Sequence, residues 1–256
     1  MISARELNGH EAEGGPLADP IAEGRRLVRA ADDEGLLVRL TGGVGIACAC
    51  PTALKPPLRR VFKDIDIVGL SSQRKRIIGV LESLGYQPDL PFNAVNGATR
   101  LLLQDSANGR QLDVFLDEVN LCHRINLRER LSLTSPSLSV SDLLLMKLQV
   151  FETNIKDYSD IAGIVADHDV GSDPLGVDLN YFGRLAGNDW GLWRTIMIVA
   201  DRARLFARDL QDFDARHLVE ARLQALLTHL EQVPKSRKWT MRAAIGERKR
   251  WYNLPE

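Results

Sequence analysis

The sequence has little cysteine and no long apolar run. Its three cysteines, Cys48, Cys50 and Cys122, contain no CxxC pair. Such an odd, sparse set argues against a disulfide framework or a zinc site and fits a reducing cytosol. No apolar stretch approaches the ~20 residues that a membrane-spanning helix needs. We therefore expect a cytoplasmic protein without a membrane segment.

Charge of one sign is also not in excess, since 33 lysines and arginines balance 34 aspartates and glutamates. A formal net charge of −1 means that the whole molecule is not built to bind a polyanion. Any contact with nucleic acid must therefore come from a local basic patch. The polar residues 1–19, rich in glycine and proline, have no apolar core like that of a signal peptide and predict a flexible N-terminal tail.

Hydrophobic periodicity divides the remaining chain into a mixed half and a helical half. Strand-like and helix-like segments alternate over residues 20–140, whereas residues 141–256 contain a series of long helical patterns. Asn108-Gly109 is a hairpin turn signal between two of the predicted strands. We expect an α+β fold, in which a mixed sheet with flanking helices at 20–140 is followed by a helical domain with a basic tail at 141–256.

The main chemical signal is a pair of aspartates within a run of isoleucine and valine. In DIDIV, Asp64 and Asp66 are two residues apart on a predicted strand, so their side chains project from one face. Like charges this close disfavour joint ionisation unless a cation lies between them. Mg²⁺ binds carboxylate oxygens together with water and phosphate. A third acid, Asp113, lies on the second strand of the predicted hairpin; the alternative is a set of surface acids on half-exposed strands.

A second signal is the Gly42-Gly43 pair, which ends a predicted strand and opens a predicted helix. Backbone N–H groups at such a helix start attract phosphate, although a Gly-Gly pair is also an ordinary turn.

The order of strand, Gly-Gly, helix, strand with DxD and strand with Asp resembles the nucleotidyltransferase superfamily, which has the DNA polymerase-β-like fold. The matching residues are Gly42, Gly43, Asp64, Asp66 and Asp113. The resemblance covers about residues 36–165. One departure is a longer basic, proline-broken insert between Gly43 and Asp64, and another is Gly43 itself, where the superfamily often has serine.

Later motifs resemble those of the AbiE-type abortive-infection toxin nucleotidyltransferases. These motifs are Lys147 in an apolar helix, the Lys156-Asp157-x-x-Asp160 run, and Arg60 ahead of the DID segment. Read from the residues alone, Lys147 is equally a lysine that reaches out to water. Asp157 and Asp160 are likewise equally solvated acids on one helix face.

The resemblance implies transfer of a nucleotide from an NTP to an acceptor hydroxyl, with release of pyrophosphate and with Mg²⁺ or Mn²⁺ as cofactor. Asp64 and Asp66 would bind both metal ions, and Asp113 would hold the catalytic metal and help to deprotonate the acceptor. Gly42 and Gly43 would bind the outer phosphates. The resemblance puts Lys147 on the triphosphate, and Asp160 would position the acceptor or a base.

The C-terminal tail combines cations with interleaved Trp239, Trp251 and Tyr252. Cations that follow phosphates and rings that stack on bases are typical of a single-strand or RNA surface. The alternative is a solvated basic helix whose tryptophans dock on the helical half. The tail cations are Lys235, Arg237, Lys238, Arg242, Arg248, Lys249 and Arg250.

The acceptor stays open at this point. RNA, as in the toxins, competes with a small molecule of the aminoglycoside-antibiotic type, and an antitoxin protein is a further expected partner for the toxin-like activity. A non-catalytic nucleotide- or RNA-binding relative is the alternative outside the enzymes. It does not explain why all three acids are present.

Overall fold

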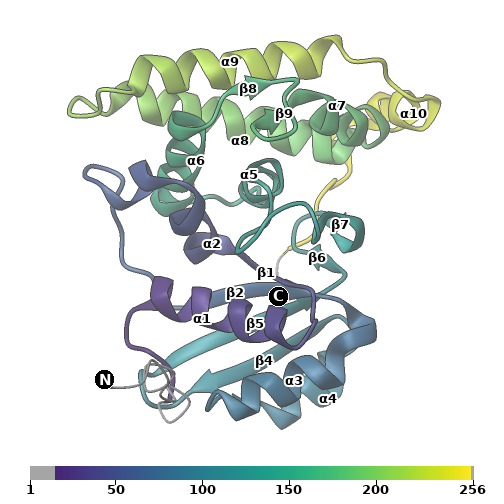
Figure 1. Cartoon of the computed structure of the whole chain (residues 1–256). Coiled ribbons are helices and arrows are strands. Elements are labelled where there is room, and N and C mark those ends of the chain that lie inside the picture. Colours follow the sequence, from purple (N-terminus) through teal and green to yellow (C-terminus); the bar gives the residue numbers. More distant parts are fainter. Residues whose placement is uncertain (1–14, 255–256) are drawn as a thin grey trace.

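A five-stranded mixed sheet forms one end of the molecule, and a layer of long helices forms the other (Figure 1). The structure is a computed structural model that describes residues 15–254, so residues 1–14 of the predicted tail lie outside it. The arrangement confirms the expected α+β fold, with a mixed sheet, flanking helices and a helical C-terminal region.

The sheet brings distant parts of the chain side by side, in the order β1-β2-β5-β4-β3. β2 and β5 run parallel, and the other neighbours are antiparallel. Thr41 pairs with Asp66, and Asp66 pairs in turn with Asp113. The strands are β1 (Val38–Thr41), β2 (Ile65–Gly69), β3 (Gln87–Pro88), β4 (Arg100–Asp105) and β5 (Arg110–Leu116).

The predicted Asn-Gly turn does connect β4 to β5, and Gly109 takes the positive φ of 62° that such a turn requires. The buried Asp105 accepts hydrogen bonds from the backbone N–H of Asn108 and from the Arg110 guanidinium. Arg110 also donates to the carbonyl of Leu17, which ties the start of the described chain to the hairpin.

The two faces of the sheet pack against different partners. Ile65, Ile67 and Val114 point into a core shared with α1 (Pro20–Asp33) and α3 (Arg74–Ser83). On the opposite face, Val68 and Phe115 belong to the core of the helical half. Because side chains alternate along a strand, Asp66 and Asp113 also lie on this second face, which looks toward the helical half.

The helical half is built around α5, whose residues are buried on nearly all sides. α8 and α9 lie along each other at the outer edge (Figure 1). No described helix is both long and apolar enough to cross a membrane. The helices are α5 (Val140–Leu148), α6 (Ile155–Asp167), α7 (Leu179–Asn188), α8 (Trp190–Asp209), α9 (Arg216–Gln232) and α10 (Arg237–Ile245).

Several short elements complete the two halves. α2 (Gly42–Ala49) follows β1, and α4 (Leu90–Asn96) precedes β4. Two small sheets pair β6 (Glu118–Asn120) with β7 (Arg124–Asn126), and β8 (Val170–Gly171) with β9 (Val177–Asp178). One hydrophobic cluster contains residues from both sides of position 141, so the predicted domain division there stays a prediction.

Residues 249–254, here named the C-terminal strap, run from α10 back toward the sheet (Figure 1, yellow). The indole N–H of Trp251 donates to Thr195 Oγ1 at 3.1 Å, and its ring meets Phe151 edge to face. Tyr252 stacks on Phe151 at 4.3 Å between ring centroids, and the Asn253 N–H donates to a backbone carbonyl. The rings of the strap therefore dock on the protein, as the second alternative for the tail expects.

Trp251→Ala should destabilise the protein by about 2–3 kcal/mol, because a large half-buried ring and its hydrogen bond are lost. A thermal melt measures the change as a lower Tm. Trp251→Phe is the matched control, since it keeps most of the ring contact and should cost less than half as much. Equal stability of all three proteins would mean that the strap is not anchored by this residue.

Candidate functional site

The parallel pairing of β2 with β5 sets Asp66 directly beside Asp113. The start of α2 lies against the Asp66 carboxylate, since a Cβ built on Gly42 would be 2.0 Å from Asp66 Oδ2. Gly42 also has a φ of +59°, which side-chain-bearing residues rarely adopt. Three of the predicted site residues, Gly42, Asp66 and Asp113, are thus brought together.

Asp66 carries an unfavourable charge in this position. Burial and the neighbouring Asp113 raise the pKa of Asp66 from 3.8 to about 6, and Asp64 adds to the rise. Lys147 and Arg100 lower the pKa of Asp66, but they do not outweigh burial and Asp113. A hard cation beside Asp66 would relieve this strain, so the carboxylate fits a role as a metal ligand.

The Asp113 carboxylate forms an ion pair with Arg100. Arg100 Nη2 and Nε lie 2.6 and 2.7 Å from Asp113 Oδ1, and Gln111 donates to Oδ2 at 3.1 Å. The Arg100 guanidinium is also near the rings of Phe92 and Phe115, at 5.5 and 5.3 Å from their centroids. No short sequence motif marks Arg100, whose guanidinium neutralises the buried Asp113 carboxylate.

Asp64 departs from its predicted position. β2 begins at Ile65, so Asp64 is an exposed residue of the preceding loop rather than a strand partner of Asp66. The strand therefore begins one residue later than predicted, and the charge of Asp64 still acts on Asp66. Within residues 15–254, no group of three His, Cys, Asp or Glu side chains is arranged to hold a metal ion.

A second cluster of charged side chains, around Lys147 and Asp160, lies across from Asp66 and Asp113. Lys147 Nζ contacts Asp160 Oδ2 at 2.8 Å and Asp157 Oδ1 at 3.0 Å. Arg60 forms two hydrogen bonds with Asp160, at 2.7 and 3.0 Å. Burial lowers the pKa of Lys147, but the two carboxylates outweigh it and the net pKa is raised. The solvated alternatives for Lys147 and Asp160 are therefore wrong, because both groups are paired inside the protein.

Arg60 joins this cluster to the glycine turn. A Cβ built on Gly43 would be 2.1 Å from Arg60 Nη2, so the guanidinium lies directly against that glycine. The start of α2 thus combines backbone N–H groups with the adjacent Arg60 guanidinium, which shares the Asp160 carboxylate with Lys147. Such a combination has the chemistry to bind phosphate oxygens.

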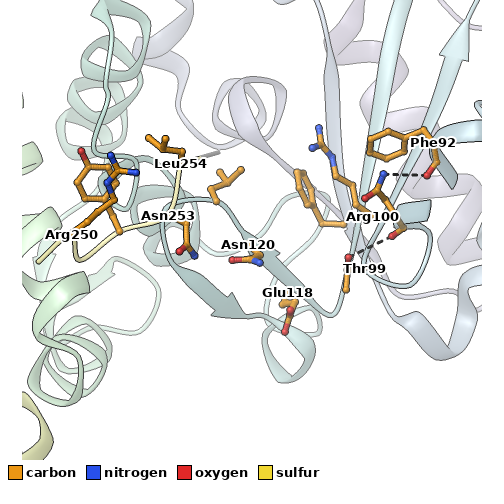
Figure 2. A pocket seen from close by; sticks show the side chains of 12 residues that line it. Phe92, Thr99, Arg100, Glu118, Asn120, Arg250, Asn253 and Leu254 are labelled. Carbon is orange, nitrogen blue, oxygen red and sulfur yellow. Dashed lines mark hydrogen bonds between the residues drawn. The ribbon is translucent and has the colours of Figure 1, made fainter. Parts of the chain in front are cut away.

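A cavity of about 550 Å³ opens on the other side of Arg100 (Figure 2). Arg100 and Phe115 line it from the sheet, and Arg250, Asn253 and Leu254 line it from the C-terminal strap. The acids themselves do not line this cavity. Arg100 therefore lies between Asp113 and the cavity and contacts both.

Comparisons with known proteins leave the family of this chain open. No protein-family model matches the sequence, and no curated protein matches it. Among solved structures, the antibiotic-resistance factor ANT(2'')-Ia is 14% identical, with a TM-score of 0.38 over 65% of this chain and 91% of that one. JHP933 from Helicobacter pylori is 13% identical, with a TM-score of 0.35 over 89% of this chain and 99% of that one. At these TM-scores, neither similarity supports a statement about activity.

Asp66→Asn should stabilise the metal-free protein at neutral pH, by at most about 3 kcal/mol. The folded-state pKa of Asp66 is raised, so its contribution to stability is complete below pH 3.8 and is lost as pH rises through about 6. The gain of the variant over wild type should therefore shrink on acidification through that window. Urea titrations at several pH values in metal-free buffer measure it. Exposed Asp212→Asn serves as the control, and a gain that does not depend on pH would contradict the assignment.

Lys147→Met should lower the free energy of unfolding by about 2–4 kcal/mol, because Asp157 loses its cation and Asp160 keeps only Arg60. Lys156→Met is the matched control, since Lys156 is exposed at the start of α6 and should change stability by less than about 0.5 kcal/mol. Thermal melts of both variants make the comparison. Equal melting temperatures would return Lys147 to the role of a lysine that reaches solvent.

Proposed function

We propose that this chain transfers a nucleotide from an NTP to an acceptor hydroxyl and releases pyrophosphate. The observation that carries the proposal is the pairing of Asp66 with Asp113 on parallel strands, directly beside a glycine-opened helix. Two clustered carboxylates next to a phosphate-binding turn are suited to phosphoryl chemistry, in which positioning and charge stabilisation supply most of the catalysis.

The triphosphate is bound on the side of the sheet that carries β1. Backbone N–H groups at Gly42 and Gly43 bind its oxygens, and Arg60 and Lys147 supply positive charge to the pyrophosphate as it leaves. Asp160 holds these two cations in place through its ion pairs, so it acts as a positioning residue.

The reacting oxygens lie between the acids. The acceptor oxygen forms a bond to the α-phosphorus, the bond from that phosphorus to pyrophosphate breaks, and the acceptor proton passes to the Asp113 carboxylate. Mg²⁺ or Mn²⁺ would neutralise charge on the phosphate oxygens if Asp64 were drawn in from its loop toward Asp66 and Asp113, since the three acids are not arranged around one metal position among residues 15–254. Before metal is present, Arg100 holds the Asp113 carboxylate in one orientation through its ion pair.

The acceptor we favour is RNA, as in a toxin-like activity, because the tail presents exposed cations. Arg237, Lys238, Arg248, Lys249 and Arg250 are exposed. Lys235 instead donates to the Leu230 carbonyl of α9, and Arg242 donates to backbone carbonyls within the tail. The docked aromatic rings do not serve as free stacking surfaces, so this contact is one of charge with phosphates. An antitoxin protein as partner is proposed on the sequence resemblance alone.

The test is incubation of the protein with each labelled NTP, Mg²⁺ and either total RNA or an aminoglycoside. Label in RNA supports the favoured acceptor, and label in the aminoglycoside supports the antibiotic-type alternative. Nucleotide binding without transfer to any acceptor supports the non-catalytic relative.

Asp113→Asn should reduce transfer at least about 10²-fold while sparing Mg²⁺–NTP binding, because the acid that accepts the proton is lost. Asp66→Asn should lose both binding and transfer, since Asp66 lies against the phosphate-binding turn as well. Calorimetric titration of Mg²⁺–NTP and the labelled assay separate the two effects, with Asp212→Asn as control. Full activity of either variant would contradict the proposed roles.

A further inference from the structure

The order of the sheet separates a donor side from an acceptor side. β1 leads into the Gly42-Gly43 turn, β2 and β5 carry the acids, and β4 carries Arg100 at the edge of the cavity. In an in-line displacement the attacking and leaving oxygens lie on opposite sides of the phosphorus. With the triphosphate at the glycine turn, the acceptor belongs on the side of the acids where the cavity opens.

The walls of the cavity come from segments far apart in the sequence (Figure 2). Phe92 and Arg100 lie on the sheet side, and Arg250 and Asn253 lie across from them on the strap, with Asn120 of β6 between. Its volume of about 550 Å³ is in the range of small-ligand sites. The cavity is therefore large enough for one unit of an acceptor and is completed by the C-terminal strap.

The charge of the cavity restricts what it can bind. The acidic residue that lines the cavity is Glu118, and Arg124 neutralises its carboxylate in an ion pair with an N–O distance of 2.7 Å. The positive charge of Arg100 is neutralised by Asp113. Arg250 is exposed and takes part in no ion pair among residues 15–254. The surplus charge is thus positive, which favours an anionic ligand and disfavours a polycationic one.

The neutral groups in the cavity add a second preference. The side-chain amides of Asn120 and Asn253 each offer both a donor and an acceptor. Phe92 brings an aromatic ring to the same cavity. Amides that read the edge of a base and rings beside its flat face are the usual means of recognising an unstacked nucleotide.

We propose that the cavity binds the acceptor through one nucleotide unit, either the terminal nucleotide of an RNA strand or a free mononucleotide. Arg250 contacts its phosphate, and Asn120 and Asn253 contact its base. This inference rests on the proposed function, since the acceptor side is defined by the donor site. The strap thereby determines which acceptors reach Asp113.

Binding of the acceptor is measured directly, without NTP, so that it does not depend on transfer. The probes are the four nucleoside monophosphates, a short single-stranded RNA with a free 3′ hydroxyl, and an aminoglycoside. Arg250→Gln and Asn253→Ala are compared with Arg29→Gln, whose arginine is exposed on α1 and does not line the cavity. Melting curves verify that each variant is folded.

Wild type should bind nucleotide probes and not the aminoglycoside. Arg250→Gln should weaken that binding about tenfold, because one charge-assisted contact to phosphate is lost. Arg29→Gln should leave it within twofold. Much tighter binding of the RNA strand than of any monophosphate identifies an RNA end as the acceptor, and equal binding identifies a free nucleotide.

Preference for the aminoglycoside, or equal losses in Arg250→Gln and Arg29→Gln, would overturn the inference. These failures differ from a failure of the proposed function. If Mg²⁺–NTP binds and transfer proceeds while Arg250→Gln binds nucleotide normally, only the acceptor site is misassigned. If wild type neither binds Mg²⁺–NTP nor transfers label, the proposed function itself is wrong.

Discussion

The parallel register of β2 against β5 is the constraint on which the rest of the site depends. It fixes the buried Asp113 carboxylate beside the half-buried Asp66 carboxylate, where water cannot fully screen them. A protein without a use for this arrangement would be more stable with an amide at one of the positions. The surrounding charges relieve the repulsion between the two carboxylates at one acid only. Arg100 neutralises Asp113, and no equivalent cation is paired with Asp66 within residues 15–254.

The helical half supplies parts of the site that the sheet lacks. Lys147 comes from the buried α5 and Asp160 from α6, and they meet Arg60 from the loop before β2. Their mutual ion pairs hold long, otherwise flexible side chains in one orientation. Because a shared hydrophobic cluster joins α5 to Val68 and Phe115, the packing that stabilises the fold also sets the distance between the two charged groups.

Much of this arrangement could be predicted from local patterns, and the remainder depends on three-dimensional register. Alternation in the apolar run located β2, and the Asn-Gly pair located the β4–β5 hairpin. The end of a strand is less well encoded, so Asp64 was assigned to β2 although it lies in the loop. Arg100 was missed for a different reason. Counting back from the hairpin turn puts it on the face of Asp113, but no short motif marks it.

The strap has a consequence for how the protein is made. Residues 250–254 leave the ribosome after every other described element, and yet they form a wall of the cavity beside Arg100. Elements that emerge earlier can fold first during synthesis. The sheet, the acids and the glycine turn can therefore form before the cavity exists, and the Phe151 ring gains its aromatic partners only when Trp251 and Tyr252 arrive. The acids and the glycine turn are thus encoded well ahead of the residues that close the cavity.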